Sequence, residues 1–204
     1  MSEPPAGQSP GAAVDSLLRA RGLPRPMAMK GRATFDVEQY RVRGRFELRL
    51  DAAAGAVLEF SGSTLLGGHR EDIVASLAGD TLRILDRERG RFYEGAGVDD
   101  FIREETRAAG DWSRAVRRIL AEPGVGPVDR AEFRSDDVRG RLADGEFRLR
   151  WERGRLVEAD WPDPAPGETF ADRLEVRYRW EGEVPVRLEA RLPGRGWRFQ
   201  LEAD

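Results

Sequence analysis

Several residue types are scarce in this chain of 204 residues, and each scarcity excludes a class of chemistry. There is no cysteine, so disulfides, thiolate metal sites and cysteine nucleophiles are ruled out. The single histidine, His69, excludes a metal site built from several histidines and leaves one residue for a histidine-based catalytic relay. No apolar run approaches the roughly 18–20 residues of a membrane-spanning helix. We therefore expect no metal and no cofactor.

Charged residues are abundant but nearly balanced. The chain has 34 Lys and Arg against 37 Asp and Glu, a net charge of -3, which gives no general attraction for nucleic acid. Lys30 is the only lysine and asparagine is absent, which indicates the codon bias of a GC-rich genome. Selection of arginine-rich faces for binding phosphate or carboxylate is the alternative.

The N-terminal segment differs from the rest of the chain. Residues 1–11 are rich in Pro, Gly and Ser, which predicts a flexible tether. A short helix is predicted over 12–21, with Val14, Leu17 and Leu18 on one face and Gly22 and Pro24 ending it. Residues 12–204 then form a single domain.

Most of the remaining sequence alternates with a period of two. From Tyr40 to Leu50 the even positions are apolar or glycine and the odd positions are charged, which predicts a strand with one buried face. Further strands are predicted where the same alternation recurs, or where a short segment is bounded by turn residues. These segments are 29–37, 56–61, 70–78, 80–86, 90–94, 147–151, 174–180, 184–192 and 197–201.

A helical insertion at about 98–122 interrupts the strands. Asp99 or Asp100 is placed to cap one helix and Asp111 a second. In the second helix the apolar stripe consists of Trp112, Ala115, Val116, Ile119 and Leu120. We predict a mainly β fold with some α (α+β): a curved antiparallel sheet of about eleven strands, an unclosed half-barrel with helices covering the concave side. Such a shape either packs solid or encloses an apolar pocket.

The order of these elements, and the motifs in residues 56–95, resemble the bacterial lipoprotein-localisation family of LolA/LolB-like proteins. The motifs are a strand at 56–60, the turn Leu65-Leu66-Gly67-Gly68, strands at 73–77 and 81–86, and a final segment at 91–95 that contains two aromatic residues and ends at Gly95. Leu65 stands where the family usually has Pro, and the lipidated cysteine is absent. A processed leader would indicate a periplasmic protein anchored at the outer membrane, whereas a native start at Met1 would indicate a cytoplasmic one.

The resemblance implies a monomeric, non-enzymatic binder of acyl chains or lipid-modified proteins. Its apolar cavity would be lined by Phe35, Phe46, Leu48, Leu58, Phe60, Trp112, Val116, Phe147, Leu149, Trp151 and Tyr178. Simple core packing of these residues is the alternative, in an envelope domain with a solid core. A lipocalin-type barrel for a small hydrophobic ligand is another, although the sequence offers no convergent polar cluster for it.

Two further surface features follow from the sequence. By the same resemblance, Leu65 and Leu66 form an exposed loop that contacts the outer membrane, unless one of them ends a strand and turns inward. His69 beside them is expected to be an exposed loop residue. A row of arginines at 41, 43, 45 and 49 could contact RNA, but RNA-binding sheets carry aromatics on that same face, and here the aromatics lie on the other. We expect no nucleic-acid partner.

Overall fold

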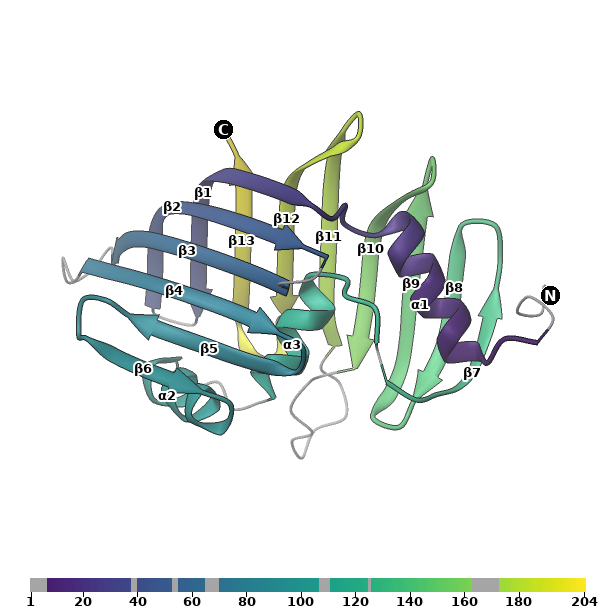
Figure 1. Cartoon of the computed structure of the whole chain (residues 1–204), viewed down its shortest axis with the longest axis horizontal. Helices are drawn as coiled ribbons and strands as arrows, with labels where there is room; N and C mark the ends of the chain where they lie inside the picture. Colours follow the sequence, from purple (N-terminus) through teal and green to yellow (C-terminus); the bar gives the residue numbers. More distant parts are fainter. Residues whose placement is uncertain are drawn as a thin grey trace.

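The computed structural model describes residues 7–37, 40–52, 55–64, 70–106, 111–124, 126–162 and 173–204. The described residues form three α-helices, one short 3-10 turn and thirteen strands (Figure 1). The helical elements are α1 (Pro10–Arg21), α2 (Ala96–Thr106), α3 (Trp112–Ile119) and η1 (Pro193–Arg195). The strands are β1 (Met27–Val37), β2 (Tyr40–Asp51), β3 (Gly55–Thr64), β4 (Arg70–Ala78), β5 (Thr81–Asp86), β6 (Arg91–Glu94), β7 (Val128–Phe133), β8 (Asp137–Leu142), β9 (Gly145–Glu152), β10 (Arg155–Pro162), β11 (Arg173–Glu181), β12 (Val184–Leu192) and β13 (Trp197–Ala203).

All thirteen strands belong to one antiparallel sheet with the order β6-β5-β4-β3-β2-β1-β13-β12-β11-β10-β9-β8-β7. The first and last strands of the chain, β1 and β13, pair with each other in the middle of the sheet. From this seam the chain runs outward as one meander to the edge strand β6, and a second meander returns from the other edge, β7, to the seam. The helices α2 and α3 join the two edges.

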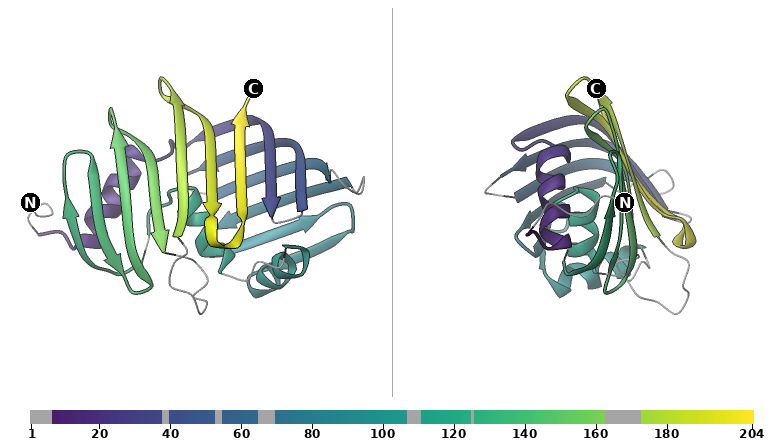
Figure 2. Two further views of the ribbon diagram at one scale, coloured as in Figure 1. Left: turned by 180° about the vertical axis from the view of Figure 1, so that it is seen from behind. Right: turned by 90° about the vertical axis from the view of Figure 1, so that its right-hand side faces the viewer.

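The predicted fold class is confirmed: the sheet is curved and does not close, because β6 and β7 stay at opposite ends of the strand order. The helices α1 and α3 lie on the concave side of the bent sheet (Figure 2). Helix α1 packs on the β7 half, and α3 lies near β4 and β5 in the other half. Helix α2 contacts β5 and β6.

The described residues contain thirteen strands, where the sequence pattern predicts about eleven. The strands absent from the predicted segments are β7, β8 and β10. In β10 a register shift between Leu156 and Glu158 breaks the period of two, so the buried residues Leu156 and Ala159 are three positions apart. A similar shift lies between Val128 and Arg130 in β7. In β8, Gly140 occupies an inward position, so the apolar signal there is lost.

The first helix starts earlier than the predicted residue 12. Ser9 accepts a hydrogen bond from the backbone N–H of Ala12, and Pro10 occupies the first helical turn. Pro10 and Gly11, included in the predicted tether, therefore belong to α1, and residues 1–6 of that tether lie outside the described part of the chain. The predicted insertion at about 98–122 corresponds to α2 and α3.

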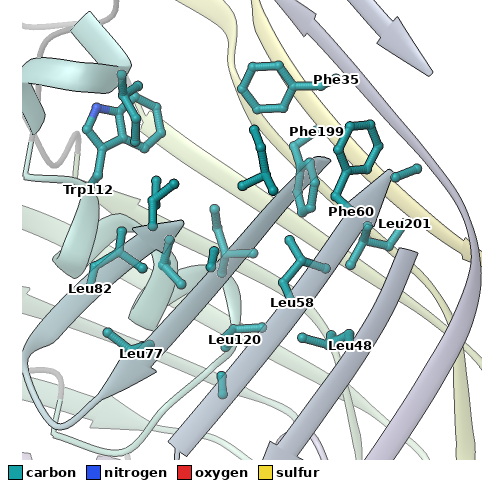
Figure 3. A pocket seen from close by; sticks show the side chains of 18 of the residues that line it. Phe35, Leu48, Leu58, Phe60, Leu77, Leu82, Trp112, Leu120, Phe199 and Leu201 are labelled. Atoms are coloured by element: carbon teal, nitrogen blue, oxygen red, sulfur yellow. The ribbon is translucent and has the colours of Figure 1, made fainter. Parts of the chain in front are cut away.

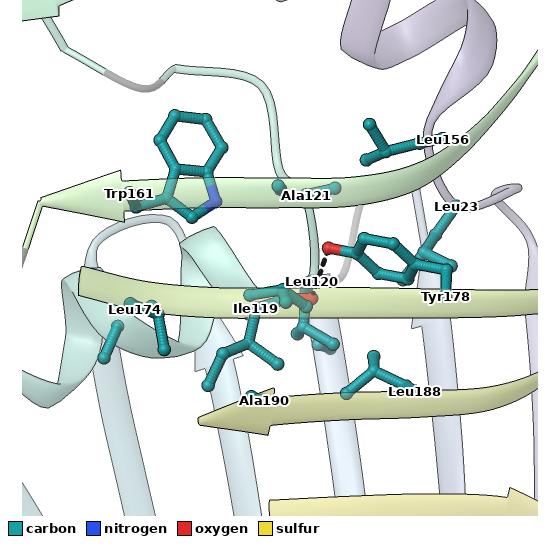
Figure 4. Packing of buried hydrophobic residues seen from close by; sticks show 14 of the residues in the cluster. Leu23, Ile119, Leu120, Ala121, Leu156, Trp161, Leu174, Tyr178, Leu188 and Ala190 are labelled. Carbon is teal, nitrogen blue, oxygen red and sulfur yellow. Dashed lines mark hydrogen bonds between the residues drawn. The ribbon is translucent and has the colours of Figure 1, made fainter. Parts of the chain in front are cut away.

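The half of the sheet formed by β8–β12 has a solidly packed core. Trp161, Leu174 and Leu156 are fully buried there, and Trp161 stacks on Phe147 with a ring-centre distance of 5.6 Å. The Tyr178 hydroxyl donates a 2.9 Å hydrogen bond to the carbonyl oxygen of Ile119, which ties the last turn of α3 to β11 (Figure 4). Burial raises the pKa of the Tyr178 phenol, so it remains a hydrogen-bond donor at neutral pH.

Candidate functional site

The other half of the sheet encloses an apolar cavity of about 250 Å³. It lies between the concave face of β1–β5 and β13 and the inner sides of α2 and α3 (Figure 3). The described residues that line it are Ala33, Phe35, Val42, Leu48, Ala56, Leu58, Phe60, Glu71, Ile73, Ala75, Leu77, Leu82, Ile84, Phe101, Ile102, Trp112, Val116, Ile119, Leu120, Trp197, Phe199 and Leu201. Glu71 is the one charged residue among them.

The period-two pattern of the strands positions this lining. In β4, for example, Ile73, Ala75 and Leu77 point into the cavity, while Val74 and Ser76 lie on the opposite, convex face. Neighbouring strands carry their apolar rows in register, so that Leu58 of β3 lies between Leu48 of β2 and Ala75 of β4.

Two glycines allow the ring of Phe60 to lie against the sheet. A Cβ atom added to Gly62 would lie 2.4 Å from Phe60 Cζ, and one added to Gly44 would lie 2.8 Å from Phe60 Cε2. Gly44 and Gly62 are opposite each other in β2 and β3. A larger residue at either position would clash with the Phe60 ring and also with the backbone of the facing strand, at Ser61 O for Gly44 and at Arg43 O for Gly62.

An aromatic group from three elements forms another wall. Trp112, at the start of α3, lies 5.5 Å from Trp197 of β13, and Trp197 meets Phe35 of β1 edge-on at 5.6 Å. The backbone N–H of Trp112 donates to Asp99 Oδ1 at 3.0 Å, which joins the start of α3 to α2. Burial raises the pKa of Asp99, and a nearby Asp111 carboxylate adds to that effect.

The side of α3 that faces away from the apolar cavity is basic and is bound to turns from both halves of the sheet. Arg117 pairs with Asp80 in the β4–β5 turn. Arg118, which is 4 % exposed, donates to Asp144 Oδ2 in the β8–β9 turn at 2.7 Å and to the Pro162 carbonyl oxygen at 2.8 Å. These contacts border a second, polar hollow of about 390 Å³. They hold α3 in place while its apolar side faces the first cavity.

Two buried carboxylates, Glu71 and Asp86, share an ion-pair partner, Arg89, whose residue is exposed. Arg89 Nη1 is 2.8 Å from Asp86 Oδ2 and 3.4 Å from Glu71 Oε2, and the backbone N–H of Arg89 donates to Asp86 Oδ1 at 3.0 Å. Burial alone would raise the pKa of Asp86, but the hydrogen bonds and the charge of Arg89 outweigh it and the net shift is downward. Asp86 is therefore an anion at neutral pH.

Six of the eleven predicted cavity residues line the cavity: Phe35, Leu48, Leu58, Phe60, Trp112 and Val116. Phe46 is buried beside it, and Phe147, Leu149, Trp151 and Tyr178 belong to the solid half of the core. Period-two patterning identifies which face of a strand is buried, but the packing of the helices decides which half stays hollow.

The predicted membrane-contact residues Leu65 and Leu66, and His69, lie outside the described residues. Sequence reasoning did not single out Glu71, Trp197 or Phe199 for the cavity. Trp197 and Phe199 were recognisable as a buried face of the last strand, but only the pairing of β13 with β1 brings them to the cavity. Glu71 was detectable as a carboxylate in the same alternating row as Ile73 and Leu77.

The convex face carries many ion pairs between neighbouring strands. Of the arginines considered for RNA contact, Arg41 pairs with Asp36, Arg45 with Asp204 at 3.1 Å, and Arg49 with a glutamate of the next strand. Within the described ranges, no group of three or more His, Cys, Asp or Glu residues is arranged to hold a metal ion. In the same ranges no helix combines the length and apolarity needed to cross a bilayer.

These features define an open antiparallel half-barrel with an apolar cavity beneath two helices. Its fold is similar to the crystal structure of a LolA superfamily protein, NE2245 from Nitrosomonas europaea, with a TM-score of 0.49 and 10% sequence identity over 95% of this chain and 91% of that chain. No protein-family model matches the sequence. No curated protein sequence matches it either.

Proposed function

We propose that this protein binds acyl chains, free or attached to lipid-modified proteins, in the apolar cavity, without catalysing a reaction on them. The observation that carries this proposal is the cavity of about 250 Å³ whose described lining is apolar except for Glu71. An apolar cavity of roughly 150 Å³ is large enough to stay dry and to bind benzene. Such a space favours hydrocarbon over water.

The energetics of the proposal are simple. Each methylene moved from water into an apolar site contributes about 0.8 kcal/mol, which is roughly a fourfold change in Kd. Affinity should therefore rise steadily with chain length until the cavity is full and then level off. No catalytic group is needed for this kind of binding.

The proposal also includes the setting that the sequence resemblance implies. The protein would act as a periplasmic carrier, or as a receptor held at the outer membrane, and its cargo would be lipid or lipoprotein. The second candidate is an envelope interaction domain that binds nothing in its core. The solid packing around Trp161 and Leu174 in the other half of the sheet favours that alternative.

A displacement assay tests the proposal. The fluorescent probe 1-N-phenylnaphthylamine is bound first, and straight-chain alcohols of 8 to 14 carbons, chosen to span the cavity, are then added to displace it. Ala75→Phe puts a ring into the cavity and should abolish displacement. Val74→Phe, on the adjacent residue and the convex face, is the matched control and should bind like the parent.

Native mass spectrometry of the purified protein supplies a second readout, in which co-purified lipid is expected. If no alcohol binds the parent and no lipid accompanies it, the proposal fails and the envelope interaction domain is the reading that stands. Equal loss of binding in Ala75→Phe and Val74→Phe would mean that the probe does not report on the cavity.

A further inference from the structure

The size of the apolar cavity limits what can occupy it. Its volume is about 250 Å³. A dry apolar cavity of roughly 150 Å³ holds benzene, which has six carbons, so in the same proportion this cavity has room for about ten carbons. Ten carbons make one acyl chain of medium length. A lipid with two such chains needs twice that room.

The floor of the cavity is narrow as well as short. On β4 the lining runs from Ile73 to Leu77, and four residue steps in a strand cover roughly 13 Å. The small side chain of Ala75 lies between two larger ones, Leu58 of β3 and Ile84 of β5, which are opposite it in the strand register. The lowest part of the floor is therefore one residue wide, a shape that suits a single chain.

The roof of the cavity is held at a fixed height. Arg118 on α3 donates to Asp144 Oδ2 at 2.7 Å, and the carbonyl oxygen of Ile119 accepts a 2.9 Å hydrogen bond from the Tyr178 hydroxyl. Both partners belong to the solid half of the molecule, and Arg118 and Tyr178 are buried. Lifting α3 to admit a second chain would break these contacts, and the loss of a buried ion pair would offset the gain from the second chain.

We infer that the cavity takes one acyl chain at a time, with about ten carbons inside, so that its ligands are single-tailed lipids such as fatty acids, fatty alcohols and lysophospholipids. This inference rests on the proposed function, since it sets the size of the ligand that the cavity holds. Each methylene that enters the cavity tightens binding about fourfold. A second tail, or the part of a chain beyond the tenth carbon, stays outside and adds little.

The first test compares one tail with two on the same headgroup. A lysophosphatidylcholine with one ten-carbon chain and the phosphatidylcholine that carries two are each titrated below their micelle concentration. Binding is followed by intrinsic tryptophan fluorescence, because Trp112 and Trp197 line the cavity. The second tail should tighten binding by less than about tenfold, whereas a second tail inside the cavity would add far more at about fourfold per methylene.

The second test locates the chain length at which the cavity is full. For straight-chain alcohols of about 6 to 14 carbons, affinity should rise with length and level off at about ten. Ala75→Leu adds three carbons to the floor and should move this break to about seven, and Phe60→Leu removes three and should move it to about thirteen. Phe92→Leu is the matched control, because Phe92 is 60 % exposed and is not among the lining residues. It should keep the break of the parent.

The outcomes separate this inference from the proposed function. If neither the alcohols nor the lysolipid binds the parent, the proposed function fails. If they bind but affinity still rises beyond about twelve carbons, or the second tail tightens binding tenfold or more, acyl binding stands and the single-chain inference is overturned. The same holds if folded Ala75→Leu and Phe60→Leu both keep the break of the parent. The two measurements on the parent decide the matter even if neither variant folds.

Discussion

Replacing Arg118 with methionine is the sharpest test of how α3 is held. The Arg118 side chain is 4 % exposed and joins three groups from the other half of the sheet. Its guanidinium donates to Asp144 Oδ2 at 2.7 Å and to the Pro162 carbonyl oxygen at 2.8 Å, and lies 5.8 Å from the centre of the Trp161 ring. Methionine keeps most of the apolar stem and removes all three polar contacts.

The expected cost follows from these contacts. Breaking a buried ion pair by removing one partner typically costs about 3–5 kcal/mol, and an unpaired buried carbonyl costs about 1–3 kcal/mol. Two features reduce the total: Asp144 is 19 % exposed and keeps Arg114 at 3.3 Å, and methionine relieves the burial of Arg118 Nε, which has no partner among the described residues. We expect Arg118→Met to lower the free energy of unfolding by about 3 kcal/mol, or Tm by roughly 6–12 °C.

Urea unfolding followed by circular dichroism measures this effect. Arg114→Met is the matched control: it lies on the same helix and pairs with the same Asp144, but is 48 % exposed, so its loss should cost less than about 1 kcal/mol. A double-mutant cycle of Arg118→Met with Asp144→Asn should give a coupling energy above about 1 kcal/mol. Equal destabilisation by Arg118→Met and Arg114→Met would refute the reasoning, as would additivity in the cycle.

Three further predictions concern the core and the convex face. Gly62→Ala should lower the free energy of unfolding, measured in urea, by about 1–3 kcal/mol, since the new Cβ would lie 2.4 Å from the Phe60 ring. Gly97→Ala in α2 is the control and should be neutral or stabilising, because nothing lies within 4 Å of its Cβ; similar effects of both variants would contradict this. Trp112→Ala should lower the free energy of unfolding by about 3–5 kcal/mol and enlarge the cavity. Longer alcohols should then bind relatively better than they do to the parent; if the dependence of affinity on chain length is unchanged, Trp112 does not form part of the cavity wall. Burial by itself would raise the pKa of Asp137, but two arginine hydrogen bonds bring it below the ordinary value, so its stabilisation is present at neutral pH and lost below about pH 4. Asp137→Asn should therefore be less stable at pH 7 and lose less on acidification to pH 3; parallel pH profiles would disprove this.

Much of the fold could be predicted because most strands keep one buried face without interruption. The alternation from Tyr40 to Leu50 corresponds to β2 almost residue for residue. Two of the three strands not predicted, β7 and β10, contain a register shift, and the third, β8, is only six residues long with a glycine in its short apolar row. The longer strands β2 and β11 keep enough of the pattern to be recognised despite Gly44 in one and a shift near the end of the other. A bulge changes which face a residue occupies, and a period-based analysis then finds no strand.

Only about half of the predicted cavity residues line the cavity. Patterning identified inward-facing residues such as Phe35 and Phe147 equally well, yet Phe35 borders the hollow half and Phe147 the solid half. The difference arises from long-range packing: Trp161 of β10 fills the space beside Phe147, whereas α3 leaves a gap above β3 and β4. Nothing local in the sequence around either phenylalanine encodes that difference.

The seam between β1 and β13 has a consequence for how the molecule assembles. Every other strand pair joins neighbours in the chain, so each half of the sheet can form by closing short loops, and only the seam requires the two ends of the chain to meet. Trp197 and Phe199 on one side of the seam and Phe35 on the other all border the cavity. The cavity therefore comes into existence only when the halves dock. A chain bound in the cavity would contact both sides of the seam, and would therefore favour the paired state of β1 and β13 over the separated one.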